Sequence, residues 1–106
     1  LQLFQAVGAR LGEANVLLTL GDLLRRGEKY EAAWQHYERV LHLYSTIGDR
    51  YSIARVLYRM GDWKVEADLD DEAIPLYNQS ITLWRGIGLA DLASQIIEPR
   101  LNRLQK

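Results

Sequence analysis

The sequence predicts an all-α fold in which antiparallel helical hairpins stack on one another. The first reason is an internal repeat, because Gly8, Gly48 and Gly88 are spaced by 40 residues. Residues 8–48 laid over 48–88 without a gap share 12 identities in 41 pairs, several times the roughly 6% per position expected from average composition. The second reason is periodicity, since apolar residues recur every three or four positions and no alternating strand pattern is present. We therefore expect about two and a half hairpin repeats.

The first unit spans residues 9–48 and is expected to hold two helices. One apolar face of its first helix is formed by Ala14, Leu17, Leu20 and Leu24. Gly27 and Glu28 then interrupt the pattern. The apolar face of its second helix is formed by Ala33, Tyr37, Val40, Leu41 and Tyr44. Gly48 is expected to end this helix, because glycine accepts the left-handed conformation that follows a helix C-terminus.

A glycine lies inside the first helix of each unit, although glycine there costs about 1 kcal/mol relative to alanine. This cost is explained if the backbone of another helix must approach closely at the glycine, where there is no side chain. We expect Gly21 to face the second helix of its own unit, with Ala33 as its contact and Tyr37 covering the neighbouring hollow. The same three residue types recur 40 positions later as Gly61, Ala73 and Tyr77.

The second unit, residues 49–88, is the less regular of the two. Lys64 occupies a position where a large apolar side chain is expected, and we expect its neighbour Trp63 to supply the missing packing. Pro75 falls inside the second helix, where it removes one backbone hydrogen bond and should bend the helix or delay its start.

The two ends of the chain are expected to be parts of further units. Residues 1–8 align with 41–48 and are interpreted as the end of a preceding helix, with apolar side chains at Leu3, Phe4 and Val7. Residues 89–106 begin a third unit and are interpreted as a capping helix, which Pro99 should kink or restart. Its inward side chains are expected to be Ala93, Ile96, Ile97, Leu101 and Leu104. Its solvated outer face is expected to hold Arg100, Arg103 and Lys106.

The repeated residues resemble the signature of the tetratricopeptide repeat (TPR) family. In the first unit the matching residues are Leu17, Leu20, Gly21, Leu24, Ala33, Tyr37 and Val40. In the second they are Leu57, Met60, Gly61, Ala73, Tyr77 and Ser80, with Lys64 as a departure. The usual repeat has about 34 residues, and the longer 40-residue form is similar to the TPRs of kinesin light chains and of bacterial NTPase-linked signalling proteins. The resemblance implies a right-handed superhelical α-solenoid.

The resemblance also implies a concave groove lined by the first helix of each unit. The groove residues carried over are Asn15, Leu18, Thr19, Asp22, Arg26, Arg55, Tyr58, Arg59, Asp62, Glu66, Gln95, Glu98 and Asn102. Arginine beside tyrosine suits an acidic or extended peptide, which it can bind by bidentate hydrogen bonds and stacking. The alternative is that Arg55 and Arg59 only neutralise Asp62 and Asp22.

Composition and charge narrow the class of protein. The 106 residues are 48% hydrophobic and 25% charged, as in ordinary folded domains. A net charge of −1 argues against broad nucleic-acid binding, which requires a basic surface. No apolar run reaches the roughly 20 residues that would span a membrane. There is no cysteine and hence no disulfide or thiol chemistry. A cytoplasmic location is the default expectation.

The residue types that carry catalysis or metals do not form a recognisable set, and we expect no cofactor, no metal and no enzyme. His36 and His42 point about 120° apart on one helix and cannot share a metal. Asp68–Glu72 resembles a cation loop but lacks the glycine and glutamate of an EF-hand. We expect Asp68 or Asp70 to cap the following helix instead. The tryptophans are interpreted as packing residues: Trp34, Trp63 and Trp84.

The resulting prediction is a non-enzymatic module that binds a peptide or protein segment in its groove. One alternative is a sensory or regulatory arm of a larger signalling NTPase or transcription regulator, and another is an architectural self-assembly segment. Stacked repeats bury a continuous core, and about three are needed for stability. The uncapped N-terminal edge near Leu11–Leu24 is therefore expected to be covered by upstream repeats, or by self-association of this chain.

Overall fold

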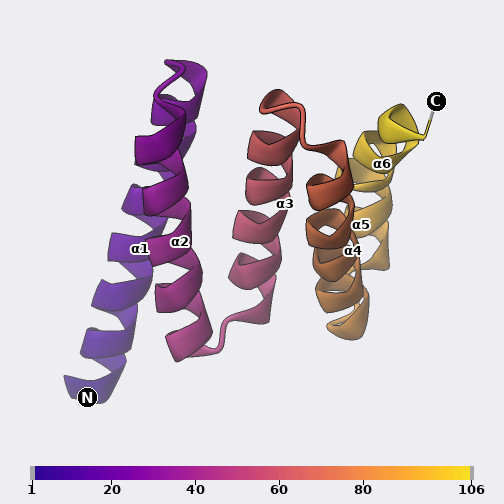
Figure 1. Ribbon diagram of the computed structural model, residues 1–106. Coiled ribbons are helices and arrows are strands. Elements are labelled where there is room, and N and C mark those ends of the chain that lie inside the picture. Colours follow the sequence, from indigo (N-terminus) through magenta and orange to yellow (C-terminus); the bar gives the residue numbers. More distant parts are fainter. Residues whose placement is uncertain (1, 106) are drawn as a thin grey trace. The chain divides into compact units, whose positions relative to one another are not determined.

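The computed structural model describes residues 2–105, with side chains from residue 8 onward, and these residues form helices and no strands (Figure 1). The helices are α1 (Gln2–Arg26), α2 (Tyr30–Ile47), α3 (Arg50–Glu66), α4 (Asp70–Gly86), α5 (Ala90–Ile96) and α6 (Glu98–Leu104). The all-α prediction is therefore confirmed. None of the described helices combines the length and the apolar character needed to cross a membrane. The chain divides into two units, residues 1–49 and 50–106.

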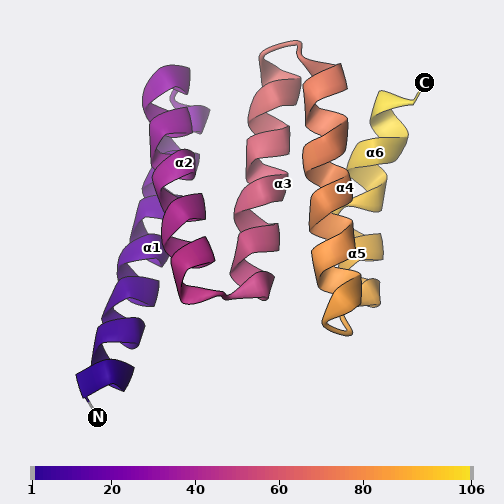
Figure 2. The ribbon, with the colours of Figure 1, turned by 60° about the horizontal axis from the view of Figure 1, so that its bottom comes forward.

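The first unit is an antiparallel hairpin of α1 and α2, which lie side by side in Figures 1 and 2. On α2 the buried side chains belong to the predicted face and include Ala33 and Tyr44. On α1 they are Ala14 of the predicted face and Leu18, which the sequence placed in the groove. As predicted, α2 ends at Gly48, which has a left-handed φ of 82° and donates its N–H to the carbonyl oxygen of Tyr44 at 2.8 Å.

The glycine inside each first helix makes room for a tyrosine ring. A Cβ added at Gly21 would lie 2.8 Å from Cε1 of Tyr37, and one added at Gly61 would lie 2.6 Å from Cε1 of Tyr77. Both distances are shorter than nonbonded carbon atoms tolerate. The ring itself therefore occupies the space that we expected Ala33 to fill, although Ala33 is fully buried.

The second unit contains the hairpin of α3 and α4, and α5 and α6 pack against α4. Its core is the cluster of Ala54, Ala73, Tyr77, Ile81, Trp84, Ala93 and Ile97. The buried hydroxyl of Ser80 donates to the carbonyl oxygen of Ala54 at 2.9 Å and so is satisfied. Helix α4 begins at Asp70 despite Pro75 within it, so the proline does not delay the helix start.

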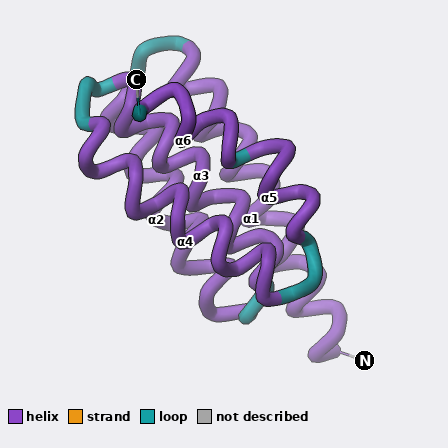
Figure 3. Tube along the Cα trace, turned by 90° about the vertical axis from the view of Figure 1, so that its right-hand side faces the viewer, coloured by secondary structure: helices purple, strands orange, loops and turns teal. Residues whose placement is uncertain are grey.

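The C-terminal segment is two short helices rather than one. Figure 3 shows α5 and α6 as separate helices, and the break lies at Ile97 because Pro99 occupies the first turn of α6. The prediction that Pro99 restarts the helix is confirmed. The predicted inward side chains also pack on the core, with Ala93 and Ile97 fully buried.

The turn inside each hairpin has the same backbone form in both units. Glu28 and Asp68 each have a φ of 62°, in the left-handed region. The left-handed conformation therefore falls on the second turn residue. The first turn residue does not need it, so Ala67 can replace Gly27 there. This geometry also corrects the capping prediction, because Leu69 precedes α4 and no side chain caps that helix.

Helix α1 differs from the expected first helix at two places. It continues through Gly8 without a break, whereas the sequence placed a helix end there. The side chains of Leu3, Phe4 and Val7, expected to pack as a preceding helix, lie outside the described residues. Leu20 was expected to face inward, but its side chain is 42% exposed.

Candidate functional site

A tyrosine and an aspartate form the same hydrogen bond in both units. The hydroxyl of Tyr37 donates to Oδ1 of Asp22 at 2.6 Å, and the hydroxyl of Tyr77 donates to Oδ1 of Asp62 at 2.6 Å. The buried ring thereby satisfies its one polar group at the edge of the hairpin. Both aspartates were predicted to line a groove, but each is held by the hairpin that it belongs to.

An arginine accompanies each of these pairs, and it comes from a different place in each unit. In the first unit, Nε of Arg25 donates to the hydroxyl of Tyr37 at 3.0 Å, and Nη2 of Arg25 lies 4.0 Å from Asp22. The position equivalent to Arg25 in the second unit is Val65. There Arg100 of α6 supplies the guanidinium.

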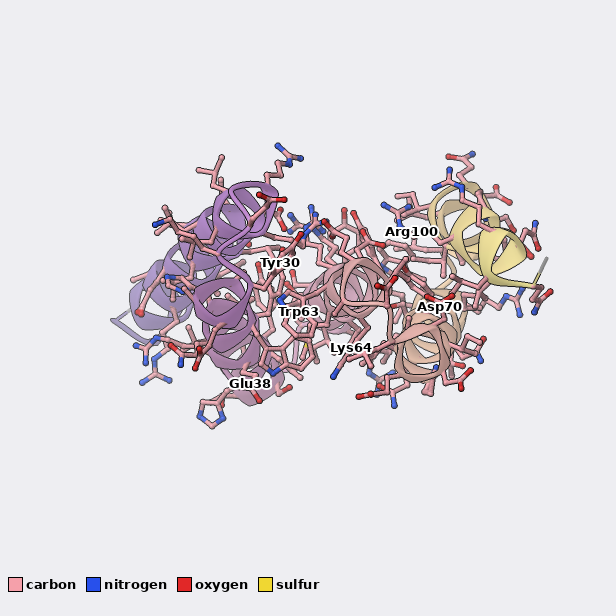
Figure 4. All side chains as sticks on the ribbon, turned by 45° about the horizontal axis from the view of Figure 1, so that its top comes forward. Tyr30, Glu38, Trp63, Lys64, Asp70 and Arg100 are labelled. Atoms are coloured by element: carbon pink, nitrogen blue, oxygen red, sulfur yellow. The ribbon has the colours of Figure 1, made fainter. Side chains whose placement is uncertain are left out.

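Arg100 binds Asp62 through two nitrogen atoms. Its Nε donates to Oδ1 at 2.8 Å and its Nη2 donates to Oδ2 at 3.3 Å. A third donor, Nη1, reaches the carbonyl oxygen of Ile96 at 2.6 Å. Arg100 therefore ties α6 to α3, and Figure 4 shows its side chain extending from α6 toward α3. The prediction that Arg100 lies on a solvated outer face is wrong.

Burial and hydrogen bonding keep these groups in fixed protonation states. Burial raises the pKa of the Tyr37 hydroxyl well above its ordinary value, and the hydrogen bond to Asp22 raises it further. Burial lowers the pKa of the Arg100 guanidinium, but the hydrogen bond and the charge of Asp62 outweigh burial and raise that pKa above its ordinary value. Tyr37 thus stays a donor and Arg100 stays a cation.

Arginine and tyrosine side chains follow one another along the side of α3 that holds Asp62. The guanidinium carbons of Arg59 and Arg100 each lie 4.8 Å from the centre of the Tyr58 ring. The guanidinium carbon of Arg55 lies 5.8 Å from the centre of the Tyr51 ring. We call this set the tyrosine–arginine face: Tyr51, Arg55, Tyr58, Arg59 and Arg100.

The buried ring of Trp84 packs against the two tyrosine rings of this face. The centre of its ring lies 6.1 Å from that of Tyr51 and 5.9 Å from that of Tyr58, and the residue is 1% exposed. Its indole N–H donates to the carbonyl oxygen of Tyr51 at 3.2 Å. The packing role predicted for Trp84 is confirmed, and the same residue fixes the two tyrosines at the surface.

The predicted groove residues of the first unit have mixed environments. Leu18 is 1% exposed and belongs to the hairpin core, so it is excluded from a binding surface. Asn15 accepts a short hydrogen bond from the hydroxyl of Tyr44. Thr19 is exposed and donates to the carbonyl oxygen of Asn15 at 3.1 Å. Arg26 is exposed at the end of α1.

The predicted groove residues of the second unit separate into two groups. Arg55, Tyr58 and Arg59 lie on one face of α3, the face that also holds Asp62. The others lie at helix ends or elsewhere: Glu66 is exposed at the end of α3, Gln95 and Asn102 are exposed on α5 and α6, and Glu98 pairs with Arg85 of α4 at 3.8 Å. The sequence reasoning missed Arg100 and Tyr51, although Val65 in place of Arg25 was a signal that another cation is needed.

The remaining sequence candidates have structural roles. The ammonium group of Lys64 pairs with Glu72 across the hairpin at 2.9 Å and lies 5.4 Å from the centre of the Trp63 ring (Figure 4). Trp34 and Trp63 are half-buried. Nδ1 of His36 lies 3.0 Å from the carbonyl oxygen of Ala32. Within the described part of the chain, no three His, Cys, Asp or Glu side chains are grouped to hold a metal ion.

Comparison with known proteins agrees with the repeated hairpins. Residues 12–86 match the family model described as tetratricopeptide repeat. The curated proteins and the solved structures gave no significant match. The match covers most of the chain and includes both glycine–tyrosine pairs described above. The chain therefore belongs to the tetratricopeptide repeat family.

Proposed function

We propose that this chain is a non-enzymatic protein-binding module whose tyrosine–arginine face binds an acidic segment of a partner protein. Members of the family generally mediate protein–protein interactions. The single observation that carries the proposal is the placement of three arginine side chains against two tyrosine rings on one unit.

The charges of this face favour an anionic partner. Asp62 is matched by Arg100 through two hydrogen bonds, so the carboxylate is already neutralised within the unit. Arg55 and Arg59 add positive charge beside that pair. Carboxylates accept the parallel N–H donors of a guanidinium with good geometry.

The tyrosines favour binding by holding the arginines in place. A guanidinium stacked on an aromatic ring has fewer conformations to lose when a ligand arrives, so less entropy opposes binding. Arg59 is further held by its own helix, since Nη1 donates to the carbonyl oxygen of Arg55 at 3.3 Å. Thr19 and Arg26, the exposed groove candidates of the first unit, are proposed as polar contacts of that unit taken by itself.

The proposal is tested by fluorescence polarisation with labelled extended peptides that are identical except for Glu or Gln at the acidic positions. The Glu peptide should bind, and added salt should weaken it because exposed charges are screened. Arg55→Ala with Arg59→Ala should reduce affinity about tenfold or more, since each charged hydrogen bond contributes about 1.5–3 kcal/mol. Arg39→Ala, which removes an exposed arginine of α2, is the matched control and should bind normally. Equal binding of the Glu and Gln peptides would rule out the acidic preference.

A further inference from the structure

We propose that one face of α1 pairs with the same face of a second copy, in an antiparallel two-fold arrangement. We call this face the α1 stripe: Ala9, Gly12, Val16, Leu20 and Leu23. Its three large side chains are unusually open to solvent, with exposed fractions of 60% for Val16, 42% for Leu20 and 56% for Leu23.

The α1 stripe is a continuous helix face that points away from the first unit's own core. Its members follow one another at intervals of three or four residues, which keeps them on one side of a helix. At about 100° per residue, the stripe lies about 170° around the helix from Ala14, Leu18 and Gly21, which face α2. Packing of α2 therefore leaves the stripe uncovered.

The internal repeat keeps this face apolar. Val56 and Met60 of α3 are the equivalents of Val16 and Leu20. An exposed apolar surface of this kind marks a site of association.

The sizes of the side chains select a second copy in antiparallel orientation. If the two-fold axis passes by Val16, Leu20 of one copy lies level with Gly12 of the other, and Leu23 lies level with Ala9. Each outer layer then joins one large and one small side chain, and the central layer joins two valines. Alternating large and small residues keep two helices at a uniform, close distance.

The charges around the α1 stripe permit this pairing. No member of the stripe is charged. The nearest charged side chains, Glu13 and Arg26, lie on opposite flanks, about 60° and 80° from the stripe's centre. In the antiparallel pair the same flank of both copies meets, and the two Glu13 residues are then about 9 Å apart along the helix axis.

The first test of this pairing is sedimentation equilibrium of the chain and its Gly12→Leu variant. Gly12 has no atom within 4 Å of an added Cβ, so this substitution fits the single chain. The chain should show a dimer mass that rises with concentration, whereas Gly12→Leu should remain monomeric because its side chain collides with Leu20 of the other copy. If the stripe associated only by non-specific apolar contact, Gly12→Leu would associate more strongly than the parent chain, because the variant adds apolar area. Leu69→Lys, at another exposed apolar residue, should dimerise like the parent chain.

The second test fixes the register by disulfide trapping, which is simple because the chain has no cysteine. Val16→Cys should form a covalent dimer rapidly under mild oxidation, because the two residues meet at the axis. Ser45→Cys, exposed on α2, should not. A chain that stays monomeric at high concentration, stronger association of Gly12→Leu, or equal trapping at the two cysteines would each overturn the proposal.

Discussion

Two glycines determine how closely the paired helices approach, because a tyrosine ring lies where each Cβ would be. The tyrosine is fixed at both ends, by the glycine surface at its ring and by an aspartate at its hydroxyl. A substitution of the glycine or of the aspartate therefore disturbs the position of the tyrosine. The repeat therefore selects three residue types together: glycine, aspartate and tyrosine.

Gly61→Ala should lower the free energy of unfolding by about 1–3 kcal/mol, the usual cost of overpacking a core. This result opposes helix propensity, which favours alanine by about 1 kcal/mol. Gly86→Ala is the matched control, since no atom lies within 4 Å of its added Cβ, and it should be neutral or slightly stabilising. Urea unfolding of both variants measures the difference. A stabilised Gly61→Ala would show that the ring does not pack as described.

Tyr37 should make the stability of the chain depend on alkaline pH. Its pKa is raised in the folded state above the ordinary value of 10.0, mainly by burial. Above pH 10 the unfolded chain loses this proton while the folded chain keeps it, so the free energy of unfolding falls as pH rises. Urea titrations from pH 8 to 11 should show a smaller fall for Tyr37→Phe than for the parent chain. Identical slopes would contradict the assignment.

At the scale of elements, the two units place a guanidinium beside the tyrosine–aspartate pair in different ways. Each tyrosine–aspartate pair has a guanidinium beside it, from Arg25 on the same hairpin in the first unit and from Arg100 on α6 in the second. In the second unit the ion pair also attaches the C-terminal helix. Helix α6 has no buried residue of its own among Glu98–Leu104, so we expect this attachment to matter.

Arg100→Ala should loosen α6 and lower the free energy of unfolding by about 1–2 kcal/mol, since a partly exposed charged hydrogen bond is lost. Hydrogen exchange at residues 98–104 should accelerate more than exchange in α3. Val65→Arg in the same chain places a guanidinium where Arg25 stands in the first unit, so it should recover stability without restoring protection of α6. Loss of stability with unchanged exchange in α6 would contradict the attachment.

The left-handed turn residues offer a further test at this scale. Glu28 has a φ of 62°, which costs a residue with a side chain about 1–2 kcal/mol. Glu28→Gly should remove this strain, although glycine also makes the unfolded chain more flexible. Thermal unfolding should therefore show a gain of up to about 1 kcal/mol. A loss of stability would mean that the glutamate side chain stabilises the turn.

For the whole molecule, the features that could be predicted from sequence are those set by local spacing. Hairpins, the interior glycines and the restart at Pro99 all follow from periodicity and backbone chemistry within a few residues. The role of Arg100 could not be predicted, because it depends on how the break at Ile97 rotates α6 toward α3. The exposure of Leu20 was missed because spacing alone does not distinguish the face toward α2 from the face away from it.

Amide NMR spectra of the chain test whether the tyrosine–arginine face binds an acidic segment. Titration with the Glu peptide should shift the amide signals of residues 51–62 and leave those of the outer side of α4, around Asn78 and Thr82, unchanged. The variant with Arg55→Ala and Arg59→Ala should lose these shifts while keeping its helical spectrum. Shifts centred on α4, or shifts that persist in that variant, would contradict binding at the tyrosine–arginine face.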